Sequence, residues 1–362
     1  MIPAHTIEGP PDAPVVVLLP SLGTTGELWS PQLPVLRRRF RVVRPEHRGH
    51  GGGAAPPGPY AIADLGRDLV ELLDHLEVER ASLCGVSLGG MAAMWVAANH
   101  PERIDRLVLA CTAPALPPAE SWRERAATVR ADGVEVLLPA LLERWFTDRE
   151  RAPLDLVTSM VATVDREGYA GCCEAIAGMD LRPDLAKISA PTLVIAGASD
   201  PVVPPAAAVD LQAAIAGAGL VVIPGAAHLA NLEQPVVFND VLVRHFWGDA
   251  AERGSEVRRE VLGTDHVARS AERNADFLGL ITRYAWGEIW TRPGLDRRTR
   301  SCITLAMLVA QSRWEELPLH LHGALRNGLT REEIDEVLLQ AAVYCGVPAA
   351  NTAFAIAERE LG

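Results

Sequence analysis

A serine flanked by glycines is the first residue whose surroundings indicate chemistry. Ser87 is the centre of GVSLG, between Gly85 and Gly89, directly after the apolar run ASLC and before the helix-like pattern GGMAAMWVAA. A serine on a sharp turn between a strand and a helix exposes its hydroxyl, and the strained backbone needs glycines on either side for clearance. The helix that follows points backbone N–H groups at an oxyanion formed there. We therefore predict that Ser87 is a nucleophile.

An aspartate and a histidine could activate this serine. A serine of ordinary acidity is a poor nucleophile, so the reaction needs a histidine as base and a carboxylate that orients the histidine. Asp200 ends the run TLVIAGASD, and His228 ends the run LVVIPGAAH. Both residues would leave the carboxyl ends of parallel strands, where open α/β sheets place their sites. The alternatives are that Asp200 only begins a turn before Pro201 and that His228 only caps a strand.

The turn PSLGTT follows the first β-like run, where a second oxyanion donor would be expected. We assign this donor to the backbone N–H of Leu22, paired with the N–H of Leu88 after the nucleophile. The alternative is that Gly23 merely forms the turn. His47 and His50 lie in the Gly-rich segment EHRGHG and are interpreted as structural.

A second acid and histidine pair lies near the C-terminus. Glu316 and His320 are four positions apart, so on one helix they share a face. A carboxylate beside a histidine can stabilise the imidazolium and so assist proton transfer. Pro318 would lie in the first turn, so this helix should begin near Glu315 or Glu316. Taken alone, such a pair is more often a surface ion pair.

The surrounding pattern predicts two domains. From Ala13 to Trp247, short β-branched runs alternate with helical patterns, which is typical of a parallel sheet covered by helices. Residues 115–185 lack a good strand and predict a helical cap. The polar run at 249–256 is interpreted as a linker, and residues 257–362 read as all helical, with a capping box from Thr330 to Glu333. The expected strands are Val15 to Pro20, Arg41 to Arg44, Ala81 to Gly85, Leu107 to Ala110, Thr192 to Ala196 and Val221 to Ile223.

Composition limits the partners. With 46 acidic and 34 basic residues the net charge is −12, and no Lys/Arg block could follow a phosphate backbone, so nucleic acid is a poor partner and a small molecule the better one. No apolar run reaches the roughly 20 residues that span a bilayer, so no membrane association is expected. Met1 to Gly9 lack a secretory pattern, and the six cysteines lack disulfide spacing, which favours the cytoplasm.

Residues 14–247 resemble the α/β-hydrolases and, among them, the 3-oxoadipate enol-lactonases. The resemblance implies an α/β fold with a helical cap, and hydrolysis of a five-membered enol-lactone that bears an acetate arm. Trp145 would line the pocket, but no particular arginine can be assigned to the substrate carboxylate. Glu46 and His47 replace the commoner Asp-Thr pair. The matching segments are PSLGTTGELW, RPEHRGHGGG, LCGVSLGG, ERWFT, EGYAGCCEAI, DLRPDLAKISAPTLVIAG and AAHLANLEQP.

Residues 260–360 resemble the 4-carboxymuconolactone decarboxylases of the alkylhydroperoxidase D-like group. The segments WGEIWTRPGLDRRTRSCITLAML and ELPLHLHGALRNGLTREEIDEVLLQAAVYCGVPAAN carry the likeness. Arg313 and Glu316 occupy the positions of the Cys-x-x-Cys pair in the peroxidase relatives, so thiol-based peroxide reduction is excluded. The resemblance assigns proton transfer to His320, Glu316 and Glu288, without cofactor or metal. A nearby group of arginines could hold the substrate carboxylates, namely Arg292, Arg297, Arg298 and Arg300.

The two resemblances fit each other chemically. Loss of CO2 from 4-carboxymuconolactone gives 3-oxoadipate enol-lactone, which is the substrate implied for the N-terminal half. We therefore expect a bifunctional enzyme of protocatechuate degradation. One alternative is a hydrolase of another small ester or lactone whose C-terminal half only mediates oligomerisation, since decarboxylases of this group form rings. A non-enzymatic binding protein is disfavoured by the intact serine, aspartate and histidine. A homo-oligomer formed through the C-terminal domain is expected in either enzymatic case.

Overall fold

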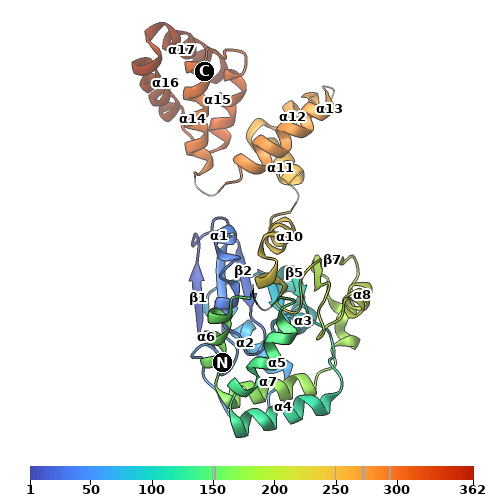
Figure 1. Cartoon of the computed structure of the whole chain (residues 1–362). Helices are drawn as coiled ribbons and strands as arrows, with labels where there is room; N and C mark the ends of the chain where they lie inside the picture. Colours follow the sequence, from blue (N-terminus) through green and yellow to red (C-terminus); the bar gives the residue numbers. More distant parts are fainter. Residues whose placement is uncertain (149, 151, 249, 271–273, 293–294) are drawn as a thin grey trace. The chain divides into compact units, whose positions relative to one another are not determined.

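The computed structural model describes residues 1–148, 150, 152–248, 250–270, 274–292 and 295–362. The chain forms two compact units, Met1–Phe246 and Trp247–Gly362. The first unit contains a β-sheet covered by helices, and the described residues of the second unit are helical and irregular (Figure 1). An α/β fold followed by an all-α domain, as expected from the alternating and then helical patterns, is confirmed.

A seven-stranded sheet forms the core of the first unit, in the order β1-β3-β2-β4-β5-β6-β7. β1 pairs antiparallel with β3, and every other pair is parallel. All strands but β1 were expected from the sequence. The strands are β1 (His5–Glu8), β2 (Val15–Leu19), β3 (Arg41–Pro45), β4 (Ala81–Val86), β5 (Ile104–Ala110), β6 (Thr192–Gly197) and β7 (Gly219–Ile223).

Helices cover this sheet. α3 lies against β2, β4 and β5, and it is apolar around nearly its whole circumference because it packs between the sheet and α2. α8 packs on β6 and β7. α10 places Phe238 beside Trp29 and Phe246 beside Phe40. The helices outside the cap are α1 (Leu33–Leu36), α2 (Ile62–His75), α3 (Leu88–Asn99), α8 (Pro205–Ala214), α9 (Ala230–Glu233) and α10 (Pro235–Trp247).

A helical cap is inserted between β5 and β6, within the region 115–185 where it was expected. It consists of α4 (Ala119–Asp132), α5 (Leu138–Trp145), α6 (Leu154–Ala162) and α7 (Arg166–Ala177). α4 and α7 run side by side (Figure 1). Arg130 of α4 binds two carboxylates of α7, Glu167 at 2.7 Å and Glu174 at 2.5 Å, so these two helices form one fixed layer of the cap.

The second unit is built of helices around two apolar clusters. Leu305, Leu321 and Leu338 belong to one cluster, and Val257, Val261 and Trp286 belong to the other. The elements are α11 (Ala250–Leu262), α12 (Thr264–Ser270), α13 (Ala275–Ile281), the π-helix η5 (Thr282–Ile289), α14 (Arg297–Ala310), α15 (Leu317–Arg326), α16 (Arg331–Cys345) and α17 (Val347–Leu361).

Two helix starts in this unit agree with the sequence. Glu316 is the residue before α15, whose first turn contains Pro318. The Thr330 hydroxyl accepts the N–H of Glu333, while the Glu333 carboxylate accepts the N–H of Thr330 at 2.9 Å, which is the expected capping box. Pro293 and Gly294, whose residue types predict a helix end, lie outside the described residues.

The segment 249–256 differs from the expected linker. Residue 249 is outside the described residues, but residues 250–256 belong to α11. Its polar residues form the outer face of a helix whose Gly254 packs so tightly that a Cβ there would lie 1.9 Å from the carbonyl oxygen of Thr282. Polar composition therefore indicated a linker where a closely packed amphipathic helix exists.

Candidate active sites

Ser87 sits on the sharp turn that its sequence context predicted. It follows β4 and precedes α3, with φ 52° and ψ −114°, a conformation that L residues adopt only under constraint. Its N–H donates to the carbonyl of Ala110 at 3.0 Å, and Thr112 Oγ1 donates to its carbonyl at 2.8 Å. A Cβ on Gly85 would lie 2.2 Å from the Gly89 backbone, so the glycine is required. These contacts hold the strained serine in place.

His228 and Asp200 form a buried pair at the same edge of the sheet. His228 Nδ1 lies 2.8 Å from Asp200 Oδ2, and both residues are buried. Asp200 Oδ1 also accepts the backbone N–H groups of Val202 at 2.8 Å and Val203 at 3.0 Å. An aspartate that accepts all three bonds keeps the proton of His228 on Nδ1, so Nε2 is left as the basic nitrogen.

The end of β5 connects the serine to this pair. Ser87 bonds to Ala110, and the next residue, Cys111, contacts the carbonyl oxygen of Ala227 with its sulfur at 3.9 Å. Burial and then the nearby Asp200 carboxylate raise the pKa of the Cys111 thiol to about 12. The ends of β4, β5, β6 and β7 thus bring the predicted nucleophile, carboxylate and base into one neighbourhood.

The turn after β2 lies against the serine turn. A Cβ on Gly89 would lie 2.3 Å from the carbonyl oxygen of Leu19 and 2.6 Å from that of Pro20, so the two backbones touch beside Leu88. Leu22 is buried in this turn, where Ser21 accepts the N–H of Thr24 at 3.1 Å. The two turns therefore adjoin, and the oxyanion site predicted at Leu22 and Leu88 stays a prediction.

Two buried histidines hold the same turn. His47 Nε2 lies 2.8 Å from the Pro20 carbonyl, and His50 Nε2 accepts the Gly23 N–H at 3.1 Å. Burial lowers the pKa of His47 to about 4 and that of His50 to about 3, so both are neutral near pH 7. These bonds agree with the structural role expected from the sequence.

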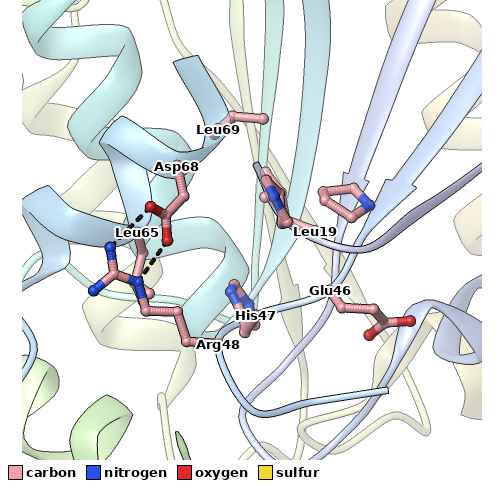
Figure 2. Close-up of a pocket in the computed structure, with 9 residues that line it drawn as sticks. Leu19, Glu46, His47, Arg48, Leu65, Asp68 and Leu69 are labelled. Atoms are coloured by element: carbon pink, nitrogen blue, oxygen red, sulfur yellow. Dashed lines mark hydrogen bonds and ion pairs between the residues drawn. The ribbon is translucent and has the colours of Figure 1, made fainter. Parts of the chain in front are cut away.

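An ion pair fixes the loop that carries these histidines. Arg48 binds Asp68 of α2 through two nitrogens, at 2.6 and 2.8 Å, and Figure 2 shows this pair next to His47. The cavity in that view is only about 20 Å³, which is room for about one water molecule. It is therefore a packing feature behind the site and not a substrate pocket.

Cap side chains lie over the turn of residues 20–25, which we call the oxyanion turn after its predicted role. A Cβ on Gly23 would be 3.1 Å from Tyr169 Cε2 and 3.8 Å from Trp145 Cη2. The carbonyl of Trp145 also accepts the N–H of Leu229, next to His228, at 3.1 Å. Trp145, expected to line a pocket, thus reaches both halves of the site. Tyr169 belongs to the segment EGYAGCCEAI, in which no sequence signal distinguishes it from its neighbours.

The second candidate site is centred on His320 of α15. The backbone N–H of His320 donates to the backbone carbonyl of Glu316 at 3.3 Å. Burial lowers the pKa of His320; the Glu316 carboxylate opposes this effect and His266 of α12 adds to it. No sequence motif surrounds His266, which comes near His320 only through the folding of α12 against α11.

A cavity of about 470 Å³ lies between the start of α12 and α15, and His266 lines it, whereas His320 and Glu316 do not. His322 lines it and lies 3.7 Å from Glu360, so it faces a different neighbour from His320. The cavity has mixed charge but more cationic than acidic groups, which suits an anionic ligand. Its lining residues are Leu262, Gly263, Thr264, Asp265, His266, Arg269, Leu319, His322 and Arg326.

The other predicted residues of this half have separate environments. Glu288 is an exposed residue of η5. Arg297 pairs with Glu260 of α11 at 2.6 Å. Arg300 donates to the carbonyls of Leu295 at 3.1 Å and of Arg292 at 2.7 Å. Their proposed contacts with substrate remain predictions.

Two properties of the described residues bear on the class of function. Across the described residues, no group of three or more His, Cys, Asp or Glu side chains is arranged to hold a metal ion. Among the helices described, none is long and apolar enough to cross a bilayer.

Comparison with known proteins gives matches in both halves. Residues 14–137 and 138–235 match the family described as alpha/beta hydrolase fold, and residues 275–359 match the carboxymuconolactone decarboxylase family. The chain is 40% identical over 235 residues, 64% of its length, to 3-oxoadipate enol-lactonase 2 of Acinetobacter baylyi, covering 88% of that protein.

Another relative and a solved structure extend this result. This chain is 49% identical to 4-carboxymuconolactone decarboxylase of Acinetobacter baylyi over 111 residues, which are 30% of its length. The match covers 83% of that protein. The crystal structure of the enol-lactonase from Burkholderia xenovorans LB400 superimposes with a TM-score of 0.65 at 40% identity, covering 67% of this chain and 95% of that one.

Proposed function

Since this chain belongs to the alpha/beta hydrolase fold family and ends in a domain of the carboxymuconolactone decarboxylase family, we propose that it catalyses two consecutive reactions. The C-terminal half decarboxylates 4-carboxymuconolactone to 3-oxoadipate enol-lactone. The N-terminal half hydrolyses that lactone to 3-oxoadipate. The substrates are those named for its relatives, and the product of the first reaction is the substrate of the second. This sequence of reactions belongs to protocatechuate degradation.

The hydrolytic step uses the serine turn. Ser87 Oγ attacks the lactone carbonyl while His228 Nε2 accepts its proton, and Asp200 stabilises the imidazolium. The N–H groups of Leu22 and Leu88 stabilise the oxyanion. The C–O bond of the ring breaks, and the leaving enolate takes a proton and becomes a ketone. Water, deprotonated by His228, then releases the product from Ser87.

The decarboxylation step needs only proton transfer and charge stabilisation. The C–CO2 bond breaks, and its electrons pass through the ring double bond into the lactone carbonyl to form a dienolate. Protonation of this dienolate on carbon gives the enol-lactone. We assign the proton donor to His320, supported by Glu316 and Glu288, and the cavity beside His266 accommodates the anionic substrate.

The observation that carries the hydrolase assignment is the buried Asp200–His228 pair at the same edge of the sheet as the strained Ser87. The test is to incubate the purified full chain with 4-carboxymuconolactone and to measure CO2 and 3-oxoadipate separately. Ser87→Ala should abolish 3-oxoadipate formation by the enzyme and leave CO2 release intact. His320→Ala should stop CO2 release but leave hydrolysis of added enol-lactone unchanged.

Each half of the proposal can fail separately. If CO2 release persists in His320→Ala, the assignment of that residue is wrong. If the unaltered chain releases no CO2 but hydrolyses the lactone, the C-terminal half serves assembly only, which is the alternative function. If Ser87→Ala still forms 3-oxoadipate at the original rate, the hydrolytic site lies elsewhere.

We also propose that copies associate through the C-terminal unit, in the cytoplasm. This unit displays large apolar side chains that are more than half exposed, which in a single copy would contact water. They are Phe277, Leu280, Tyr284, Met307, Leu339, Val343, Tyr344 and Val347. Light scattering should give a multiple of the chain mass, reduced by Val343→Glu together with Tyr344→Glu. A monomeric mass for the unaltered chain would contradict this proposal.

A further inference from the structure

A buried hydroxyl in the cap lacks a hydrogen-bond partner. Tyr169 of α7 is fully buried, and its hydroxyl forms no hydrogen bond of good geometry among the described residues, although the side chain of Arg125 approaches it. Its ring stacks on His50 with centroids 6.4 Å apart, and its Cε2 borders Gly23 of the oxyanion turn. Burying a hydroxyl without a partner is costly, so a group of this kind beside a reaction site indicates that something else binds it.

An arginine lies close to this hydroxyl. Arg125 of α4 lies over the ring of Trp122, 4.8 Å from its centroid. Burial raises the pKa of Tyr169, and the Arg125 guanidinium opposes that rise. Arg125 has the same effect on Cys173, which lies one helical turn after Tyr169. Because α4 packs on α7 and the Arg125 side chain approaches the Tyr169 hydroxyl, the guanidinium lies on the side of α7 that carries Tyr169.

Arg125 differs from the other cap arginine that contacts α7. Arg130 is bound by the carboxylates of Glu167 and Glu174 through four hydrogen bonds. Within the described part of the chain, no carboxylate or carbonyl oxygen is paired with Arg125, whose position on α4 is partly buried. The Tyr169 oxygen can accept one N–H of Arg125. The phenol O–H and the remaining guanidinium N–H groups are donors that neither residue can satisfy for the other.

We propose that Arg125 and Tyr169 together bind the carboxylate of the acetate arm of the lactone, and so select acidic lactones over neutral ones. The inference rests on the proposed hydrolase function and adds its substrate-binding residues. A carboxylate has two oxygens that accept from a guanidinium and a hydroxyl at once. Tyr169 and Trp145 border the oxyanion turn, and the backbone of that turn touches the serine turn, so a carboxylate held here lies on the side of the site where the lactone would bind.

The first test compares two lactones. One is 3-oxoadipate enol-lactone, and the other has the same ring with a methyl group in place of the carboxymethyl arm. Arg125→Met should lower kcat/KM for the acidic lactone by about 10- to 100-fold, mainly through KM, because charge-assisted hydrogen bonds are lost. It should change kcat/KM for the neutral lactone little. Tyr169→Phe should act in the same direction but less strongly.

A matched control is available on the same helix. Arg123 is exposed and pairs with Glu120 at 3.1 Å, so Arg123→Met removes a guanidinium from α4 without touching α7. It should leave kcat/KM for both lactones unchanged. If Arg125→Met lowers activity on both lactones equally, Arg125 is merely structural and the inference is overturned. It is also overturned if activity on the acidic lactone is unchanged.

The second test does not depend on which lactone is hydrolysed. Adipate, a six-carbon dicarboxylate, is titrated calorimetrically into the full chain carrying Ser87→Ala, with and without Arg125→Met. Binding should weaken about tenfold or more with Arg125→Met, but not with Arg123→Met. The inference is overturned if Arg125→Met does not weaken adipate binding. It is also overturned if the Ser87→Ala chain with Arg125 intact does not bind adipate. Failure to hydrolyse the acidic lactone, with adipate binding intact and dependent on Arg125, would instead refute the proposed function.

Discussion

The backbone N–H of Gly23 donates a hydrogen bond to Nε2 of His50 at 3.1 Å, across 27 positions of the chain. The other ring nitrogen of His50 lies 2.9 Å from the carbonyl oxygen of Arg48, so the imidazole carries its proton on Nδ1. Because His50 already engages the N–H of Gly23, Leu22 is the residue of this turn to which we assign the oxyanion donor. His50 is therefore a positioning residue for the hydrolytic site.

His50→Ala should lower kcat for lactone hydrolysis by about 10- to 100-fold with little change in KM, because a displaced oxyanion donor affects the transition state more than substrate binding. Steady-state kinetics with the enol-lactone measure this split. CO2 release by the other half of the same chain is the internal control. A parallel fall of both activities would indicate general misfolding instead, and an unchanged kcat would contradict the positioning role.

The buried histidines also predict how stability depends on pH. In the unfolded chain a histidine has a pKa near 6.5, whereas in the fold burial lowers that of His47 to about 4 and that of His50 to about 3. Between these values the unfolded state binds more protons, so stability falls as pH drops from about 6.5 to 4. Each residue contributes a slope of up to about 1.4 kcal/mol per pH unit.

Hydrogen exchange of the β2 and β4 amides at pH 7, 6 and 5 measures this dependence in the first unit alone. His50→Gln should flatten the fall, because one fewer buried imidazole must take up a proton on unfolding. His75→Gln, an exposed change on α2, should leave the slope as it is. A stability that rises towards pH 5 would be incompatible with neutral buried histidines.

The glycine before the serine turn predicts a large loss of stability. Gly85→Ala places a methyl group 2.2 Å from the Gly89 backbone, in a part of the core where no flexible side chain can move away. The unfolding free energy should fall by at least about 2 kcal/mol. In the matched variant Gly178→Ala, the added methyl group lies 3.6 Å from the nearest atom, the carbonyl oxygen of Glu174, and the change should be tolerated. Urea unfolding compares the two variants.

The sequence predicts the elements of this fold whose residues have a strong local hydrophobic pattern. β4 is fully buried, so its run of apolar residues identified it, whereas β1 (HTIE) has no buried residue and gave no signal. Ser87, Asp200 and His228 could be predicted because strand ends and glycines mark them in the sequence. Tyr169 and His266 carry no such mark, because Arg125 and His320 come from other helices and approach them only in the folded chain.

Glu316 and His266 affect the pKa of His320 in opposite directions. Replacing each of them should therefore shift the pH profile of CO2 release in opposite directions. The Glu316 carboxylate raises the pKa of His320 and His266 lowers it, against a larger lowering by burial. Glu316→Gln should therefore move the His320 limb of the pH–rate profile to lower pH, and His266→Gln should move it to higher pH. The profile of lactone hydrolysis on the same protein should not move. Shifts in the same direction for both variants would show that His320 does not sit between these two groups in the working enzyme.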